Sequence, residues 1–505
     1  ISGLIAFGDM QHTAHVCDLA VTLTSVLRNT AAERPADTWA LSAAVLNGYQ
    51  RHRQLTHDEA DVLPDLVLAR LGLTLAISQR RAVEHTDNLD YINQYDAATV
   101  RVLAELTDLD PGELHRRFHR LAGTGRAWLG QPAPEPAELL RRRRAVTGGT
   151  LSPVFYSQPL NIARGEGPWL FTAEGTRYLD AYNNVAVVGH AHPVVVQSVS
   201  RQLRLLNTHS RYLHGDLVEL GERLLATMPA ELDTILFTTS GTEANELAWR
   251  MATAVTGGNA AIIAEHAYHG SSKWLADLSP NEWPPGHRPE HIERYAAPRL
   301  STGGVDRATA IQRVADAGAR LGAAGDRAAL VLADLGFTSE GILDAPAEFI
   351  GGLVAGAHEC GALFLADEVQ SGFGRVGPAM WRFALAEVTP DFVTLGKPMG
   401  AGYPIGALVT RREIADALAR DYEYFSTFAG SAAAAASGLA VLDVLESERI
   451  PQRAVEVGEY LREQLRALAA RDGRLGEVRG IGLIAGVDVV GGGPEREARR
   501  TFARA

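Results

Sequence analysis

The two stretches that decide the fold are LFLADEVQSGFGR, residues 363–375, and TLGKPMGAGYP, residues 394–404. The first is typical of a buried strand that ends in Asp367, and the second places Lys397 in a glycine-rich turn thirty residues later. A lysine amine can form a Schiff base with an aldehyde, and a carboxylate can keep a pyridine nitrogen protonated so that the ring accepts electrons. The pair therefore predicts the layout that a pyridoxal 5'-phosphate (PLP) enzyme needs.

Composition narrows the class of protein. The 505 residues allow two or three domains, and 46% hydrophobic with 21% charged residues is typical of globular proteins. The net charge of −12 argues against a nucleic-acid surface. Cys17 and Cys360 suggest no disulfide framework. The apolar stretch 429–445 is short and interrupted by Asp443, so we interpret it as a buried helix rather than a membrane span. We expect a cytoplasmic protein without nucleic-acid or membrane partners.

The chain changes character twice. Residues 1–122 have helical patterns at 36–54, 58–81 and 96–106. Residues 123–149 are rich in glycine and proline and predict a linker with one short helix, whose arginines 141–144 we interpret as a solvated face rather than a nucleic-acid patch. Residues 150–505 alternate short apolar runs with helical stretches, which predicts an α/β domain with a mostly parallel sheet covered on both faces.

The expected strands and helices place polar residues at one edge of that sheet. The strands are 234–239, 260–264, 329–333, 362–366, 392–395 and 405–409, and the helices are 243–256, 306–322 and 347–359. In parallel sheets, ligands bind beyond the carboxyl ends of the strands. Thr239, Glu265, Asp334 and Asp367 lie at or just past such ends.

Two motifs in this part of the chain are candidates for cofactor contacts. TTSGTEANE, 238–246, follows a strand and opens a helix, so its small residues and free N–H groups could hold a phosphate, although an ordinary helix cap is an equal alternative. HAYHG, 266–270, offers an aromatic ring that could stack on a flat cofactor or simply be a core tyrosine. Its histidines, with GHAHP at 189–193, lack the companion ligands of a known metal site, so we predict no metal.

Further motifs carry a family resemblance. They are YNNV at 182–185, GHAHP at 189–193, LNTHSRYLH at 206–214 and YFSTFAG at 424–430. With these, residues 150–505 resemble the class III aminotransferases, which are fold type I PLP enzymes. The details are most similar to the branch that holds alanine–glyoxylate-like aminotransferases and ethanolamine-phosphate and phosphohydroxylysine phospho-lyases.

The resemblance implies a role for individual residues. Lys397 matches the Schiff-base lysine, which also moves protons, and Asp367 matches the partner of the pyridine nitrogen. Gln370 matches the residue that binds the cofactor's phenol oxygen. The other positions implied to bind the cofactor are Ser240, Gly241 and Thr242 at its phosphate, Tyr268 and Val369 against its ring, and His269.

Two further matches concern the partner subunit and the substrate. Thr427 matches a threonine that reaches the phosphate from a second subunit, which implies a homodimer. Arg479 matches an arginine that often pairs with a substrate carboxylate, for which its planar, two-pronged geometry is suitable. The sequence departs from the family after Thr427, where AGSA at 429–432 replaces the usual Gly-Gly-Asn-Pro or Gly-Gly-Ser-Pro. The family also continues beyond the position of Ala505, so we expect a truncated small C-terminal domain.

The N-terminal segment has a resemblance of its own. GLIAFGDM, residues 3–10, and VCDLA, residues 16–20, resemble the later half of an aminoglycoside or choline phosphotransferase lobe. That family usually has Ile-Asp-Phe-Gly-Asp, and here Ala6 replaces the first aspartate and leaves Asp9. The nucleotide lobe and the catalytic loop are not present, and a kinase needs both to hold its metal and ATP. We expect a mainly helical, non-catalytic remnant of a kinase-like lobe. No signal peptide is recognised. The sequence does not open with methionine and residues 1–5 look like the middle of a strand, which suggests a fragment.

These observations predict a PLP-dependent transaminase that moves an amino group between a small amine or amino acid and a keto acid. If the substrate carries a phosphate on the neighbouring carbon, the same carbanion can expel it, so a phospho-lyase acting on a phosphorylated amino alcohol is the alternative. A catalytically idle fusion scaffold is a third interpretation. Intact Lys397, Asp367, Gln370 and Tyr268 argue against that interpretation.

Overall fold

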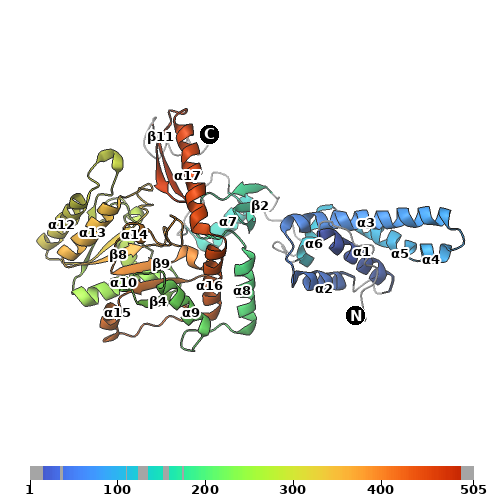
Figure 1. Cartoon of the computed structure of the whole chain (residues 1–505), viewed down its shortest axis with the longest axis horizontal. Helices are drawn as coiled ribbons and strands as arrows, with labels where there is room; N and C mark the ends of the chain where they lie inside the picture. The colour runs from blue at the N-terminus through green and yellow to red at the C-terminus, as the bar shows by residue number, and fades with distance from the viewer. Residues whose placement is uncertain are drawn as a thin grey trace. The chain divides into compact units, whose positions relative to one another are not determined.

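The structure, a computed structural model, describes residues 15–33, 38–109, 111–122, 135–149, 151, 159–172 and 176–490. The chain divides into two compact units, one of residues 1–165 with 169–179, the other of residues 166–168 with 180–505 (Figure 1). The candidate site residues all belong to the second unit.

The first unit is mainly helical, as the sequence predicts. Its helices are α1 (His15–Glu33), α2 (Thr38–Gln50), α3 (His57–Glu84), α4 (Leu89–Asn93), α5 (Asp96–Thr107), α6 (Pro111–Ala122) and α7 (Pro136–Thr147). Helices α1, α2, α3, α5 and α6 bury a core that includes Leu23, Leu46, Leu71 and Phe118. The short helix expected in the linker is α7. The motif with Ala6 and Asp9 lies outside the described residues, and nothing in the structure supports the kinase-like identity of this unit.

A small three-stranded sheet, in which β2 and β3 are antiparallel, follows these helices. Its strands are β1 (Ile162–Glu166), β2 (Trp169–Thr172) and β3 (Arg177–Leu179), in that order. The guanidinium of Arg177 lies over the Trp169 ring, 4.3 Å from its centre, which helps hold β3 against β2.

The second unit is built on a seven-stranded sheet of order β4-β10-β9-β8-β7-β5-β6. These strands are β4 (Thr234–Thr238), β5 (Ala260–Ala264), β6 (Ile292–Tyr295), β7 (Ala328–Asp334), β8 (Leu363–Asp367), β9 (Phe392–Leu395) and β10 (Gly406–Thr410). The pairs β5–β6, β5–β7, β7–β8 and β8–β9 are parallel, which confirms the mostly parallel sheet. Strand β10 runs antiparallel to both of its neighbours, β4 and β9.

The sequence predicts six of the strands and misses β6. The missed strand reads IERY, in which charged residues interrupt the apolar run, so the pattern that identifies a buried strand is weak. The antiparallel direction of β10 was also not predicted, because an apolar run of this kind does not encode strand direction.

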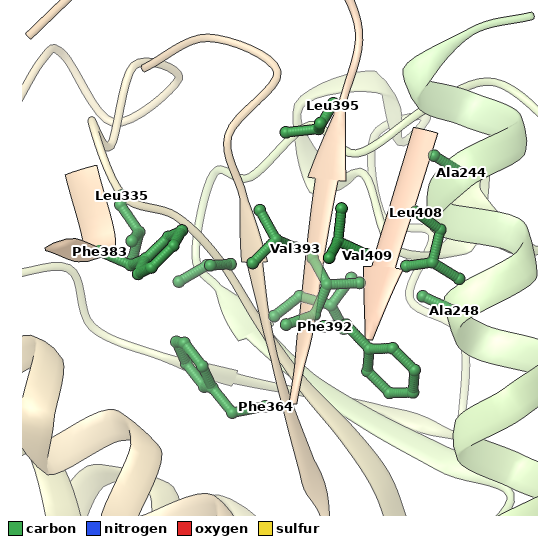
Figure 2. Close-up of a cluster of buried hydrophobic side chains, with 14 of the residues drawn as sticks. Ala244, Ala248, Leu335, Phe364, Phe383, Phe392, Val393, Leu395, Leu408 and Val409 are labelled. Atoms are coloured by element: carbon green, nitrogen blue, oxygen red, sulfur yellow. The ribbon is translucent and has the colours of Figure 1, made fainter. Parts of the chain in front are cut away.

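Helices cover the sheet and bury its side chains. The covering helices include α10 (Gly241–Thr256), α12 (Arg307–Ala323), α13 (Ala347–Glu359) and α14 (Arg382–Leu385). Leu408 of β10 points toward Ala244 and Ala248 of α10, whereas Phe364 and Phe383 lie on the other side of the strands (Figure 2). All five side chains are buried, so the expected coverage of both faces is confirmed.

The remaining elements surround this sheet. They are α8 (Pro193–Leu205), α9 (Gly215–Leu225), α11 (Lys273–Asp277), α15 (Arg412–Ala419), α16 (Ala432–Ser447), α17 (Ile450–Ala469), β11 (Leu475–Ile481) and β12 (Ile484–Val489). Helix α16 is the alanine-rich stretch that the sequence identifies as a buried helix, and twelve of its sixteen residues are buried. Helix α17 packs on the antiparallel hairpin β11–β12. Among the helices of the described ranges, none is long and apolar enough to cross a membrane.

Candidate active site

A cavity of about 350 Å³ opens at the carboxyl ends of the central strands. Its walls come from the start of α10, the segment after β5, the ends of β7 and β8, and the turn after β9. Nine of the eleven site residues predicted from the sequence line it together: Ser240, Gly241, Thr242, Tyr268, His269, Asp367, Val369, Gln370 and Lys397. Thr427 and Arg479 are not among the described residues that line it.

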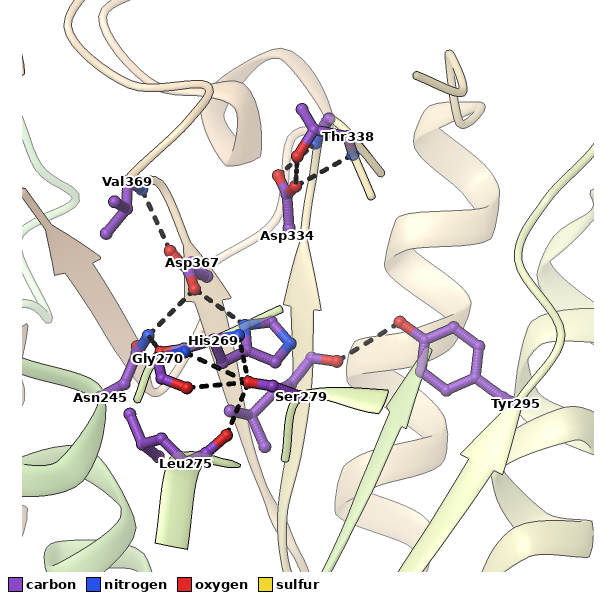
Figure 3. Close-up of polar contacts among 12 residues, drawn as sticks. Asn245, His269, Gly270, Leu275, Ser279, Tyr295, Asp334, Thr338, Asp367 and Val369 are labelled. Atoms are coloured by element: carbon purple, nitrogen blue, oxygen red, sulfur yellow. Dashed lines mark hydrogen bonds and ion pairs between the residues drawn. The ribbon is translucent and has the colours of Figure 1, made fainter. Parts of the chain in front are cut away.

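Asp367 ends β8 and is almost completely buried in this cavity. Its carboxylate pairs with His269 Nδ1 at 2.8 Å and accepts hydrogen bonds from Asn245 Nδ2 at 3.0 Å and from the Val369 N–H at 3.1 Å (Figure 3). Burial alone would raise the pKa of Asp367. The hydrogen bond and charge of His269, with the other two donors, instead hold that pKa below its usual value. The cavity therefore contains a fixed negative charge.

A second carboxyl group lies beside the first. Asp334 ends β7 and pairs in register with Asp367 of the neighbouring parallel strand. Its oxygens accept hydrogen bonds from the N–H groups of Gly336 and Thr338, both at 3.0 Å, and from the Thr338 hydroxyl. Burial first, and then the charge of Asp367, raises the pKa of Asp334. Two adjacent buried carboxyl groups resist carrying charge together, so Asp334 ionises less readily than Asp367, whose hydrogen-bond donors favour the charged form.

The start of α10 forms another wall of the cavity. Ser240 is the N-cap, and its hydroxyl accepts a hydrogen bond from the N–H of Glu243 at 3.2 Å. The helix-cap alternative is therefore correct for this side chain. It remains compatible with anion binding, because the first N–H groups of any helix have no partner inside the helix and carry the positive end of its dipole. Gly241 and Thr242 place these groups at the cavity wall.

The segment after β5 carries Tyr268 and His269, whose side chains have different surroundings. Tyr268 lines the cavity, and burial followed by the charge of Glu282 raises its pKa. His269 is buried, and its ring contacts the Asp367 carboxylate. The Ser279 hydroxyl braces this segment by accepting a hydrogen bond from the N–H of His269 at 2.9 Å (Figure 3).

Lys397 and Gln370 complete the lining. Lys397 follows β9 and begins a short 3₁₀ turn, Lys397–Gly400, where it is partly buried. Gln370 follows β8 by three residues and accepts a hydrogen bond from the Asn184 side chain. Both side chains therefore face the same cavity from turns at the carboxyl ends of adjacent strands.

Arg479 and Thr427 occupy other surroundings. The side chain of Arg479 is only 8% exposed and donates to Asp488 Oδ1 at 2.7 Å and to the carbonyl oxygens of Gly341 and Ile342 at 3.0 and 3.2 Å. The hydrogen bond to Asp488 is the main cause that raises the pKa of Arg479. In this structure the guanidinium of Arg479, which the sequence analysis assigned to a substrate carboxylate, is thus bonded to the carboxylate of Asp488 in the same chain. Thr427 is exposed to solvent.

Sequence reasoning did not assign roles to three polar residues around the site. Asp334 was identified only as a strand end, and Asn184 only as part of a family motif. Asn245 could have been found, because it is a buried amide among the apolar residues of α10. In the described parts of the chain, no group of three or more His, Cys, Asp or Glu side chains could hold a metal ion.

The cavity fits PLP on observations of its own residues. A Cβ atom on Gly241 would come within 2.7 Å of a Val369 methyl carbon, and one on Gly396 within 3.1 Å of the Gly241 nitrogen. Side chains therefore do not fit at Gly241 and Gly396, and the backbone at this wall carries none, as the close approach of a phosphate requires. Away from the helix start, the ionised Asp367 can hold a protonated ring nitrogen, and Lys397 lines the same space.

Comparison with known proteins gives one family for most of the chain. The family model described as aminotransferase class-III matches residues 153–504. The alanine–glyoxylate aminotransferase 2-like protein of Drosophila melanogaster is 36% identical over 374 residues, which cover 71% of this chain and 75% of that protein.

Solved structures agree with this result. A phospholyase from Arthrobacter in complex with phosphoethanolamine is 41% identical, with a TM-score of 0.66, and the match covers 70% of this chain and 85% of that one. A taurine:2-oxoglutarate aminotransferase from Bifidobacterium kashiwanohense, in complex with PLP and glutamate, has a TM-score of 0.63 and 23% identity, over 71% of this chain and 84% of that one. The second likeness concerns the fold alone.

Proposed function

Because this chain belongs to the class-III aminotransferase family, we propose that the cavity around Lys397 and Asp367 is the active site of a PLP-dependent transaminase. The observation that carries the proposal is the convergence of the helix start at Gly241, the ionised carboxylate of Asp367 and the amine of Lys397 on one cavity. Its substrates are small amines or amino acids and keto acids.

Each residue would hold one part of the cofactor. The first N–H groups of α10, with Thr242, would bind the phosphate, and Tyr268 and Val369 would lie against the ring. Asp367, whose pKa is lowered, would hold a proton on the pyridine nitrogen, and Gln370, which lines the same cavity, would bind the phenol oxygen. When bound, PLP supplies the electron sink that makes the hydrogen on an amine-bearing carbon acidic.

The proton transfers then belong to the protein. The Nζ atom of Lys397 would remove the proton from the amine-bearing carbon of the substrate and return a proton at a neighbouring position. Water would then release the first substrate as a keto compound, and a keto acid would take up the amino group by the reverse steps. Asn245 and His269 keep Asp367 ionised throughout, because they supply hydrogen bonds that offset its burial. Burial and the charge of Asp367 raise the pKa of Asp334, so Asp367 is the more readily ionised of the two carboxyl groups at this end of the cavity.

A phospho-lyase is the second candidate, and two observations favour it. The 41% identical phospholyase was solved in complex with phosphoethanolamine, a compound without a carboxylate. In this chain Arg479, the expected carboxylate ligand, is bonded to Asp488. In that reaction the electron pair left by proton removal expels a phosphate from the adjacent carbon, and Lys397 would act on the same proton.

One experiment separates the two candidates. Purified protein is incubated with phosphoethanolamine alone and, separately, with pairs of amino acid and keto acid. We expect amino transfer, with the visible absorption of the cofactor bleached by the amino donor and restored by the keto acid. Release of inorganic phosphate without an amino acceptor would instead establish the phospho-lyase.

The assignment of Lys397 has its own test. The chain has only two lysines, Lys273 and Lys397. We expect borohydride to fix the cofactor on Lys397, as read by peptide mapping. Label on Lys273, which lies at the start of α11 near the Trp274 ring, would overturn the assignment.

We also propose a homodimer, in which Thr427 reaches the cofactor of the second subunit. Two segments beside Thr427 support this. The Phe425 ring lies 5.8 Å from the His209 ring and 4.0 Å below the guanidinium of Arg211, so the segments touch. They expose large apolar side chains, namely Leu205, Leu206, Tyr212, Leu213, Phe425 and Phe428. Sedimentation of Leu213→Asp should show monomers that bind PLP weakly.

For the location in the cell, we propose the cytoplasm. Both cysteines are free, which supports a reducing setting of this kind.

A further inference from the structure

The turn from Asp180 to Val185 is braced by its own side chains. The Asp180 carboxylate accepts hydrogen bonds from two backbone N–H groups of the turn, at 3.2 and 2.8 Å, and pairs with His190 Nε2 at 2.7 Å. The side-chain oxygen of Asn183 accepts from the N–H of Val185 at 2.9 Å. Such side-chain to backbone bonds fix the turn on both sides of Asn184.

Asn184 extends from this turn to Gln370. Its Nδ2 group donates a hydrogen bond to Oε1 of Gln370. Gln370 lines the cavity with Lys397. An amide has an acceptor at one end and two donors at the other. With Oε1 turned toward Asn184, Nε2 is the atom that Gln370 offers to the cavity.

We propose that Asn184 is a positioning residue that fixes the orientation of the Gln370 amide. The inference rests on the proposed function, in which Gln370 binds the phenol oxygen of PLP. That oxygen is anionic, so a donor from Nε2 stabilises it, whereas a reversed amide would present Oε1 and repel it. Hydrogen bonds to charged oxygens are about twice as strong as neutral ones, so the orientation matters.

Two substitutions make the inference testable. In Asn184→Asp the new carboxylate can only accept, so Gln370 should turn its Nε2 toward residue 184 and present Oε1 to the cavity. In Asn184→Ala the partner is lost and both orientations become available. We expect PLP affinity, measured by titrating the cofactor-free protein, to fall about tenfold in Asn184→Asp and about threefold in Asn184→Ala.

The visible absorption band supplies a second measurement. The phenol oxygen of the cofactor shares a proton with the nitrogen that joins the cofactor to Lys397. Without a donor from Gln370 this proton is lost less readily, so the pH at which the visible band is half converted should rise, more in Asn184→Asp than in Asn184→Ala. Asn183→Ser is the matched control. It keeps a hydroxyl acceptor for the Val185 N–H in the same turn, so both measurements should stay at the wild-type values.

A double-substitution cycle with Gln370 shows whether the Asn184 variants act on PLP affinity through Gln370 or through a general disturbance of the turn 180–185. Combined with Gln370→Ala, neither Asn184 variant should change the affinity or the midpoint further, since the residue acts only through Gln370. Shifts that persist in the Gln370→Ala background, or single variants identical to wild type, would overturn the inference. A wild-type protein without the band on Lys397 would overturn the proposed function on which the inference rests.

Discussion

Asp367 is the residue on which the charge of the candidate site depends. Three donors converge on its buried carboxylate, so that it stays ionised where burial alone would favour a proton. We expect Asp367→Asn to fold, because an amide of the same shape can keep part of this network. It should lose about a hundredfold or more of kcat, since a neutral group no longer holds the ring proton. Steady-state kinetics beside far-UV circular dichroism check this, and Asp334→Asn is the companion variant, whose expected loss is smaller.

The sequence could single out Lys397 and Asp367 as candidate site residues because each lies in a recognisable local pattern. A strand that ends in a carboxylate and a lysine in a glycine-rich turn are local patterns. The engagement of Arg479 could not be predicted in this way. Its partner Asp488 is nine residues away, on the other strand of the β11–β12 hairpin, and only the pairing of Arg479 with Gly486 brings the two side chains together. The contact of Asn184 with Gln370, 186 residues apart, is likewise set by tertiary structure.

At the scale of elements, Asp391 ties together the strands that carry the site. Its side chain, 1% exposed, accepts from the Phe364 N–H of β8 at 2.7 Å and pairs with Arg411 at 2.7 Å and His358 at 2.9 Å. Removing one partner from a buried ion pair leaves an unpaired charge or donor. Asp391→Ala should therefore lower the free energy of unfolding by about 3 kcal/mol, as measured by denaturant titration. An unchanged midpoint would contradict this.

The same contact predicts a pH dependence. Burial alone would raise the pKa of Asp391, but the hydrogen bonds from His358 and the Phe364 N–H lower it. The stability that ionised Asp391 contributes is therefore present above the pKa of the unfolded state and is lost as the pH falls through the folded pKa. The hydrogen bond to Asp391 raises the pKa of His358, so the contribution of His358 exists below its unfolded value and is lost as the pH rises through the folded pKa. His358→Gln should remove the second change from the pH profile of the thermal midpoint and leave the acid limb in place.

A helix cap gives a prediction for the helical unit. Thr56 and Glu59 form a reciprocal capping box at the start of α3, with Glu59 accepting from the Thr56 N–H at 3.0 Å. Thr56→Ala should lower the stability of that unit by about 1 kcal/mol. In calorimetry we expect the transition of the helical unit to move and that of the PLP-binding unit to stay. A shift in both would mean that the two units unfold together.

Elements were predicted where periodicity is strong and missed where it is weak. Helix α13 was predicted with the bounds that the structure has, and β9 likewise. Strand β6 was missed because Glu293 and Arg294 lie in the middle of it, where their partners come from other elements, such as Arg320 for Glu293. A charged pair inside a strand is visible in the sequence, but the arginine that neutralises it is not.

The molecule joins a helical unit to a unit built on a seven-stranded sheet, and among the described residues the candidate site belongs to the second unit. We expect this chain not to turn over ATP, because Ala6 stands where the phosphotransferase-like motif would have its metal-binding aspartate. The assay compares ADP formation with that of Asp9→Ala. Turnover that Asp9→Ala abolishes would show that the N-terminal segment is an active phosphotransferase.

The position of β10 between β4 and β9 also affects the order in which the sheet can assemble during translation. Strand β4 reaches the rest of the sheet only through β10, with Thr238 paired to Gly406, yet β10 is synthesised about 170 residues later. Until then β4 and the adjoining helix start at Gly241 have no neighbour on the β9 side. A nascent chain stopped before β10 should therefore be unable to bind the cofactor and should expose an unpaired strand edge to chaperones during much of its translation.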